Sequence, residues 1–173
     1  EAKSAIAELK STGVERTVML TGDSAARAAI IAEQAGLDGF EAALLPDGKL
    51  DAAVRLKEGG KLLYAGDGIN DAPVMTAADC AVSMGKVGSD AAIEASDVVL
   101  VSDKLLLLPK GRRIARGTRS IVMQNIVGSL IIKAAIMALD IAIAGFPLII
   151  SVVADVGVML VAVLNALRTN LLK

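Results

Sequence analysis

The chain has 173 residues, of which 54% are hydrophobic, and its formal net charge is −1. It contains one cysteine and no histidine, which excludes a disulfide framework and a zinc finger. Two phenylalanines, one tyrosine and no tryptophan leave no aromatic platform on which a single-stranded nucleic acid could stack. The composition therefore predicts no nucleic-acid partner.

Charge and hydropathy divide the sequence near residue 109. Beyond Pro109 the chain holds eight of its 18 basic residues but two of its 19 acidic residues. These bases border a long apolar run, as in segments that are attracted to anionic membrane surfaces. We therefore expect two domains, residues 1–109 and 110–173. The chain opens without a methionine or the apolar core of a signal peptide, and we expect it to be the C-terminal piece of a longer protein.

In the first domain, helical patterns alternate with short apolar runs. The first helix places Ile6 and Leu9 inward and ends before Gly13, whereas Ser24 is expected to cap a helix that stops at Gly36. This alternation predicts an α/β fold with a doubly wound, mainly parallel sheet. The expected elements are helices over 1–12, 25–35 and 46–58 and strands over 16–20, 62–65, 80–84 and 98–101.

The most informative motif is Gly-Asp-Gly-Ile-Asn-Asp-Ala-Pro at residues 66–73, directly after the strand predicted over 62–65. Open α/β sheets bind ligands at the carboxyl ends of their strands. Asp67 and Asp71 offer the hard oxygen ligands that Mg²⁺ prefers. The motif predicts a phosphate and Mg²⁺ site, and a turn that is merely rich in Asp and Gly is the alternative.

Two apolar runs follow, over residues 121–144 and 148–167, separated by Gly-Phe-Pro at 145–147. Each is long enough to cross about 30 Å of hydrocarbon at about 1.5 Å per residue. The outer flanks of the pair are basic and the turn has no base, so the positive-inside rule places both ends in the cytoplasm. We expect a transmembrane helical hairpin. A buried hairpin in a soluble protein is the alternative.

Each apolar run carries an ionisable residue near its middle, Lys133 in the first and Asp155 in the second. Charges at membrane depth are costly and usually mark an ion path. In an antiparallel hairpin the two side chains would lie at similar depth and could pair when no metal is bound. Alternatively, Lys133 could extend along its own helix toward the interface. Asp140 lies near the turn and is expected at the outer interface.

The order of four motifs resembles the heavy-metal (type IB) P-type ATPases: Thr21-Gly22-Asp23 after a strand, Lys49 in the third helix, the motif at 66–73, and the hairpin. The resemblance covers essentially the whole chain. It implies a partial haloacid-dehalogenase-like (Rossmann-like) phosphorylation domain, followed by the last two transmembrane helices of a pump in the plasma (inner) membrane.

The resemblance also implies roles for individual residues. The phosphate site would use Mg²⁺ as cofactor and ATP as substrate. A lysine in the penultimate helix and Asp-x-Gly in the last helix are similar to the branch that exports Zn²⁺, Cd²⁺ and Pb²⁺. The implied residues are Thr21, Gly22 and Asp23 at the phosphoryl group, Lys49 to neutralise its charge, Asp67 and Asp71 for Mg²⁺, Asn70 to orient the site, Asp155 as ligand of the transported ion, Lys133 as its counter-ion, and Gly157 in the same motif.

The Asp-Lys-Thr-Gly-Thr motif of this family, with its phosphate-accepting aspartate, is absent from these 173 residues. In the family its strand lies between those that carry Thr21 and Gly66, so we expect a gap in the sheet there. We also expect the chain alone to have no ATPase activity and to require the missing N-terminal portion of the same ATPase. The alternatives are a soluble phosphatase of the haloacid-dehalogenase type and a non-catalytic, membrane-anchored regulator of an intact pump.

Overall fold

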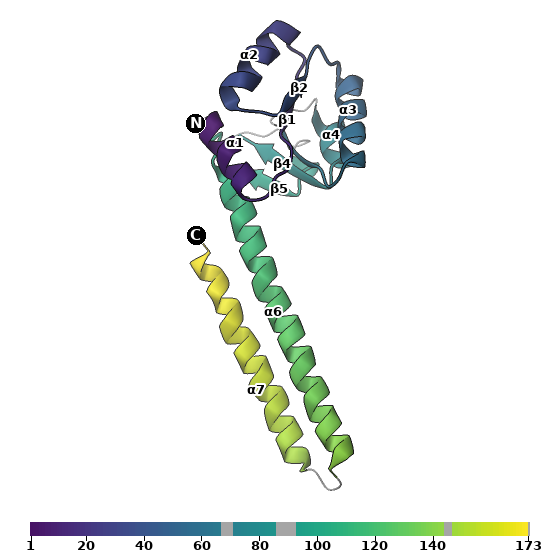
Figure 1. Cartoon of the computed structure of the whole chain (residues 1–173), viewed down its shortest axis with the longest axis vertical. Helices are drawn as coiled ribbons and strands as arrows, with labels where there is room; N and C mark the ends of the chain where they lie inside the picture. Colours follow the sequence, from purple (N-terminus) through teal and green to yellow (C-terminus); the bar gives the residue numbers. More distant parts are fainter. Residues whose placement is uncertain (67–70, 86–92, 144–146, 173) are drawn as a thin grey trace. The chain divides into compact units, whose positions relative to one another are not determined.

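The computed structural model describes residues 1–66, 71–85, 93–143 and 147–172. The chain divides into two units, Glu1–Pro109 and Lys110–Lys173, and Figure 1 shows an α/β unit and a pair of long helices. Asp67 and Asn70 of the Gly-Asp-Gly motif lie outside the described residues.

The α/β unit alternates helices with short strands. Three elements coincide with the predicted ones: α2 (Ala25–Ala35), α3 (Pro46–Glu58) and β4 (Cys80–Met84). Strand β2 (Gly39–Glu41) and helix α4 (Ala72–Ala77) were not predicted. Gly36 ends α2 in the left-handed conformation, with φ 72°, as expected. Ser24 occupies the N-cap position of α2, but its side chain makes no capping hydrogen bond. The elements are α1 (Ala2–Ser11), β1 (Val18–Leu20), α2 (Ala25–Ala35), β2 (Gly39–Glu41), α3 (Pro46–Glu58), β3 (Leu63–Gly66), α4 (Ala72–Ala77), β4 (Cys80–Met84) and β5 (Val98–Leu100).

The strands form two separate parallel ladders. One ladder joins β1 to β2, and the other runs in the order β3-β4-β5. Among the described strands, no ladder joins β1 to β3. This break lies where the sequence predicted a gap. The carboxyl end of β1, which precedes Thr21, and the carboxyl end of β3, at Gly66, therefore belong to different ladders.

Helix packing connects the two ladders. Helix α3 follows β2 and α4 follows β3, and these two helices pack against each other. Ala52 and Ala53 of α3 and Val74 and Met75 of α4 are buried, which removes apolar surface from water across the break. Lys57 adds a hydrogen bond from its Nζ to the Ala77 carbonyl oxygen, at 2.9 Å.

An aspartate precedes the second strand of each parallel pair and bonds the backbone of the first. Each carboxylate accepts a hydrogen bond from a backbone N–H within one residue of the start of the neighbouring strand. Such charge-assisted bonds are stronger than neutral ones, so the amino ends of the strands are fixed by side chains as well as by the ladders. The three bonds join Thr17 N to Asp38 Oδ2 (2.8 Å), Leu62 N to Asp79 Oδ2 (3.0 Å) and Ala81 N to Asp97 Oδ2 (2.8 Å).

The second unit contains α6 (Leu107–Ala142) from Lys110 onward, α7 (Leu148–Ala166) and a short 3₁₀ helix, η2 (Leu167–Leu171). Both long helices are apolar enough to cross a membrane, and only 6% and 0% of their most apolar stretches are buried. In a soluble protein such apolar helices would be buried in a core, but the described part of the chain leaves them exposed. Helices α6 and α7 run antiparallel and side by side (Figure 1). Helix α6 begins well before the predicted span, because the basic segment after Pro109 is helical too.

Candidate functional site

Lys49 and Asp71 meet in an ion pair of 2.8 Å between Nζ and Oδ1. Lys49 lies in the first turn of α3, after Pro46 at the start of that helix. Asp71 is the N-cap residue of α4, yet its carboxylate makes no capping bond to the helix backbone. The side chains are only 20% and 10% exposed. Two residues that sequence places 22 positions apart thus share one partly buried site near the carboxyl end of β3.

Gly66, the first residue of the motif, approaches this pair closely. A Cβ on Gly66 would lie 3.0 Å from Asp71 Oδ2, so a larger residue at position 66 would press on the carboxylate. Ser83, opposite Gly66 in β4, is 1% exposed and its hydroxyl has no partner within the described ranges. Nothing in the sequence singled out Ser83.

Thr21, Gly22 and Asp23 form a tight turn after β1. The Asp23 N–H donates to Thr21 Oγ1 (3.1 Å) and the Leu44 N–H donates to the Thr21 carbonyl oxygen (3.1 Å). Because a Cβ on Gly22 would lie 3.3 Å from the Leu44 carbonyl oxygen, glycine permits this close approach. Ala43, beside Leu44, has φ 54°, an uncommon conformation for alanine that the sequence did not signal.

The structure brings together only some of the predicted phosphate-site residues. Lys49 and Asp71 are in direct contact, and the turn at Thr21 is linked through Leu44 to the segment that leads into α3. Asp23 pairs with Arg27 at 3.9 Å. Between the described residues, no hydrogen bond joins Thr21 or Asp23 to Lys49 or Asp71.

In the helical unit, Lys133 of α6 and Asp155 of α7 form an ion pair with 2.7 Å between Nζ and Oδ1. The expected pairing of these two side chains is therefore present, and Lys133 reaches the neighbouring helix instead of extending along its own. Opposite charges that neutralise each other lower the cost of placing both at membrane depth.

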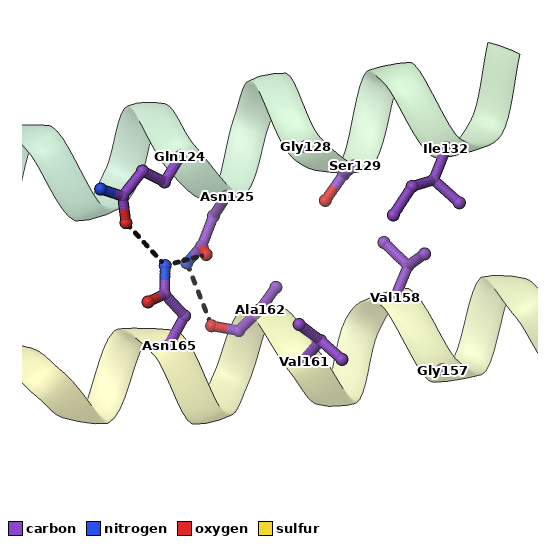
Figure 2. A pocket seen from close by; sticks show the side chains of 10 residues that line it. All are labelled: Gln124, Asn125, Gly128, Ser129, Ile132, Gly157, Val158, Val161, Ala162 and Asn165. Carbon is purple, nitrogen blue, oxygen red and sulfur yellow. Dashed lines mark hydrogen bonds between the residues drawn. The ribbon is translucent and has the colours of Figure 1, made fainter. Parts of the chain in front are cut away.

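Two further polar contacts join the helices, and neither was predicted. Toward the turn, Ser151 Oγ donates to both carboxylate oxygens of Asp140, at 3.1 and 3.2 Å, so Asp140 has a partner on α7. The second contact lies on the other side of Asp155, where a groove of about 370 Å³ lies between α6 and α7. Figure 2 shows the amide side chains of Gln124, Asn125 and Asn165 hydrogen-bonded to one another at one end of this groove. Gly157 lines this groove.

Cys80, at the start of β4, was interpreted as a small apolar residue beside a strand. It is a free, half-buried thiol. Burial, with a smaller contribution from the charge of Asp97, raises the pKa of this thiol. A thiol that stays protonated is a poor nucleophile and metal ligand, which agrees with a structural role.

Comparisons with known proteins show that the chain is similar in sequence and structure to one part of metal-transporting ATPases. A family model of haloacid dehalogenase-like hydrolases matches residues 1–79. The chain is 51% identical over 171 residues (97% of its length) to a zinc-transporting ATPase of Synechocystis sp.. It is 43% identical over 100% of its length to a cadmium, zinc and cobalt-transporting ATPase of Bacillus subtilis. A crystal structure of a zinc-transporting PIB-type ATPase in the E2·Pi state matches 96% of the chain with a TM-score of 0.87 and 37% identity.

These relatives are much longer than the chain. It spans 24% of the Synechocystis protein, 25% of the Bacillus protein and 27% of the crystallised ATPase. The alignments cover both the α/β unit and the two long helices.

Proposed function

By homology along nearly its whole length, the chain belongs to the heavy-metal P-type ATPases, and we propose that it is the part of such a pump that joins phosphate chemistry to the cation path. In this proposal residues 1–109 belong to the phosphorylation domain and residues 110–173 to the membrane domain. The full pump would hydrolyse ATP to export Zn²⁺, Cd²⁺ or Pb²⁺.

The observation that carries the proposal is the ion pair between Lys133 and Asp155. A carboxylate can bind a divalent cation, and a lysine that neutralises it in the absence of metal can move away when the cation arrives. We assign Asp155 as a ligand of the transported ion and Lys133 as its counter-ion, and Gly157 belongs to the same motif. Both helices are long and apolar enough to cross a membrane.

At the phosphate site we assign Thr21 and the Gly22 amide to the phosphoryl group, with Asp23 in the same turn. Lys49 would balance the charge that develops on the transferring group. Asp67 and Asp71 would hold Mg²⁺, which supplies further charge neutralisation when bound, and Asn70 would orient the site. The low exposure of Asp71 and its lack of a capping bond to α4 support a role outside secondary structure.

The phosphate-accepting aspartate is not part of this sequence. We therefore propose that the chain needs the N-terminal portion of a pump for activity. The break between the two ladders supports this requirement, because it leaves room in the hydrogen-bonding pattern for another strand. We also propose that both ends of the helical hairpin face the cytoplasm, since basic residues flank it on both outer sides and its turn has none.

A soluble phosphatase and a non-catalytic regulator explain the observations less well. A soluble enzyme would not need two long helices that the rest of the described chain leaves uncovered. A regulator would have no need for a buried Lys49–Asp71 pair or for Lys133–Asp155. The matches to transporters extend over both units.

A chimera tests the proposal directly. The chain would replace the matching segment of the Synechocystis zinc-transporting ATPase, and Zn²⁺-stimulated ATP hydrolysis would be measured in proteoliposomes. We expect the chimera to be stimulated, Asp155→Ala to abolish stimulation, and Asp140→Asn, which alters the other carboxylate of the helix pair, to retain it. Unchanged stimulation in Asp155→Ala would remove Asp155 from the cation path.

The isolated chain provides the second arm of this experiment. We expect it to release no phosphate from ATP above the level of its Asp67→Asn variant. Steady hydrolysis by the unmodified chain, and not by the variant, would show that no further portion is needed.

A further inference from the structure

A cluster of three amide side chains joins α6 to α7 at one end of the groove between them (Figure 2). Asn165 of α7 donates from Nδ2 to Asn125 Oδ1 (2.8 Å) and to Gln124 Oε1 (3.4 Å), both on α6. Asn125 donates from its own Nδ2 to the Ala162 carbonyl oxygen of α7, at 3.0 Å. Arg168 donates to Asn165 Oδ1 at 3.0 Å. Every polar atom of Asn125 and Asn165 side chains is therefore engaged.

The amide cluster and the ion pair require the same alignment of α7 along α6. Lys133 lies eight residues after Asn125 on α6, about 12 Å along the axis, and Asp155 lies ten residues before Asn165 on α7, about 15 Å. The difference is within the reach of a lysine side chain. A shift of α7 by one residue would move each group by about 1.5 Å and turn it by about 100°, which would separate both sets of partners.

Packing between the cluster and the ion pair is incomplete. The groove of about 370 Å³ is lined there by the small residues Gly128, Ser129 and Gly157 and by the larger Ile132, Val158 and Val161. At Gly128 and Gly157 an added Cβ would meet nothing within 4 Å from the rest of the described chain, so the larger side chains do not fill the space between the helices. Apolar contacts are also non-directional, and specific polar contacts therefore define the register more sharply, as single buried asparagines do in coiled coils.

The ion pair cannot supply it throughout the transport cycle. When a cation binds Asp155, the carboxylate is occupied and Lys133 is released. The amide cluster is neutral and keeps its bonds whatever the charge at Asp155. In an apolar surrounding an amide that loses its partner is costly, so the cluster resists sliding in the loaded state as well.

We propose that Asn125 and Asn165 are positioning residues that hold Asp155 at the depth and orientation in which it binds the transported cation. This inference rests on the proposed function for the role of Asp155. The clasp itself, meaning the bonds of Asn125 and Asn165 across the two helices, can be tested without it.

The first test measures the register itself. Spin labels at Ile131 and Val153, which are exposed by 64% and 63%, would report inter-helix distances in the whole chain in lipid nanodiscs, in a Cys80→Ser background. We expect a narrow distance distribution that survives removal of the ion pair by Lys133→Met with Asp155→Ala. Adding Asn165→Ala should then broaden or shift it. An unchanged distribution in the triple variant would overturn the clasp, even if transport is lost.

The second test measures its consequence in the chimera. Asn125→Ala and Asn165→Ala should each raise the half-saturating Zn²⁺ concentration about tenfold with maximal turnover changed less than about twofold. The effect of the double variant should be smaller than the sum of the two single effects, because both changes break the bond between Asn165 and Asn125. Asn165→Gln, which keeps the amide, should restore part of the affinity.

Ser129→Ala is the matched control. Ser129 lines the same groove, and its hydroxyl makes no hydrogen bond to the described residues of α7. It should leave the Zn²⁺ dependence unchanged. Altered distances with normal Zn²⁺ affinity would overturn the positioning role, whereas failure of Asp155→Ala to affect stimulation would overturn the proposed function and leave the distance result standing.

Discussion

The two ends of the strands in the α/β unit use the same residue types in different ways. At the amino ends, Asp38 and Asp79 each pair with an exposed or half-exposed lysine and also accept a backbone N–H. Near the carboxyl end of β3, Asp71 pairs with Lys49 and bonds no backbone group of its helix. The ion-pair distances are similar, at 2.6, 2.8 and 2.8 Å.

This difference distinguishes carboxylates that stabilise the fold from carboxylates that are available to bind a ligand. A carboxylate that holds a backbone N–H is part of the fold, because its loss leaves a strand end without a partner. A carboxylate that is held only by a flexible lysine can exchange that partner for a ligand. Partial burial, with side chains 20% and 10% exposed, strengthens the Lys49–Asp71 interaction and limits the access of other partners until a ligand arrives.

The largest effect is expected at Lys49. In the chimera, Lys49→Met should lower the maximal rate of Zn²⁺-stimulated ATP hydrolysis by roughly 100-fold, because one preorganised charge at a transferring group contributes that much. The measurement is steady-state phosphate release at saturating ATP and Zn²⁺.

Lys61→Met is the matched control for this prediction. Lys61 makes an ion pair of the same length with Asp79, but its side chain is 90% exposed. Exposed pairs contribute little, so turnover should stay within about twofold of the parent. Comparable losses in the two variants would contradict the distinction between the strand ends.

The next effect is on stability and arises at Asp97. Its carboxylate accepts the N–H of Ala81, a residue that is 1% exposed. Asp97→Ala leaves this buried donor without a partner, which should cost about 1–3 kcal/mol of unfolding free energy. Hydrogen exchange at the Ala81 amide, measured on the chain in detergent micelles, should accelerate accordingly.

Asp97→Asn separates the hydrogen bond from the charge. Asparagine retains an acceptor oxygen of similar size, so it should recover more than half of the loss caused by alanine. Equal exchange rates in the two variants would mean that the charge of Asp97, and not its bond to Ala81, stabilises this end of the sheet.

Local sequence signals predicted much of the fold. Gly36 and Pro46 mark helix ends through their own backbone preferences, and the helices at these positions were predicted within a residue. Strand β2 was missed because three residues are too few for alternation. It is fixed instead by Asp38 and Thr17, which are 21 positions apart in the sequence.

In the candidate sites, too, contacts between residues far apart in the sequence were harder to predict than local features. The Lys133–Asp155 pair could be predicted because two opposite charges at equal depth have few other partners. The contacts of Asn125 with Asn165 and of Asp140 with Ser151 were not predicted, because they depend on how each helix is rotated about its axis. Composition and span length do not determine that rotation.

The smallest effect concerns acid stability and arises at Asp38. Hydrogen bonds from Lys10 and from the hydroxyl and N–H of Thr17 lower the pKa of this carboxyl from 3.8 to about 2. A carboxyl whose pKa is lower in the folded state stabilises the fold above its unfolded pKa, and the contribution is lost as pH falls toward the folded pKa. Between about pH 4 and pH 2, Asp38→Asn should therefore weaken the dependence of unfolding on pH, and exchange at the Thr17 amide should become less sensitive to acid. Asp51→Asn is the control, since Asp51 is exposed and its side chain makes no hydrogen bond or ion pair in the described part of the chain; the same flattening in that variant would mean that Asp38 is not the group responsible.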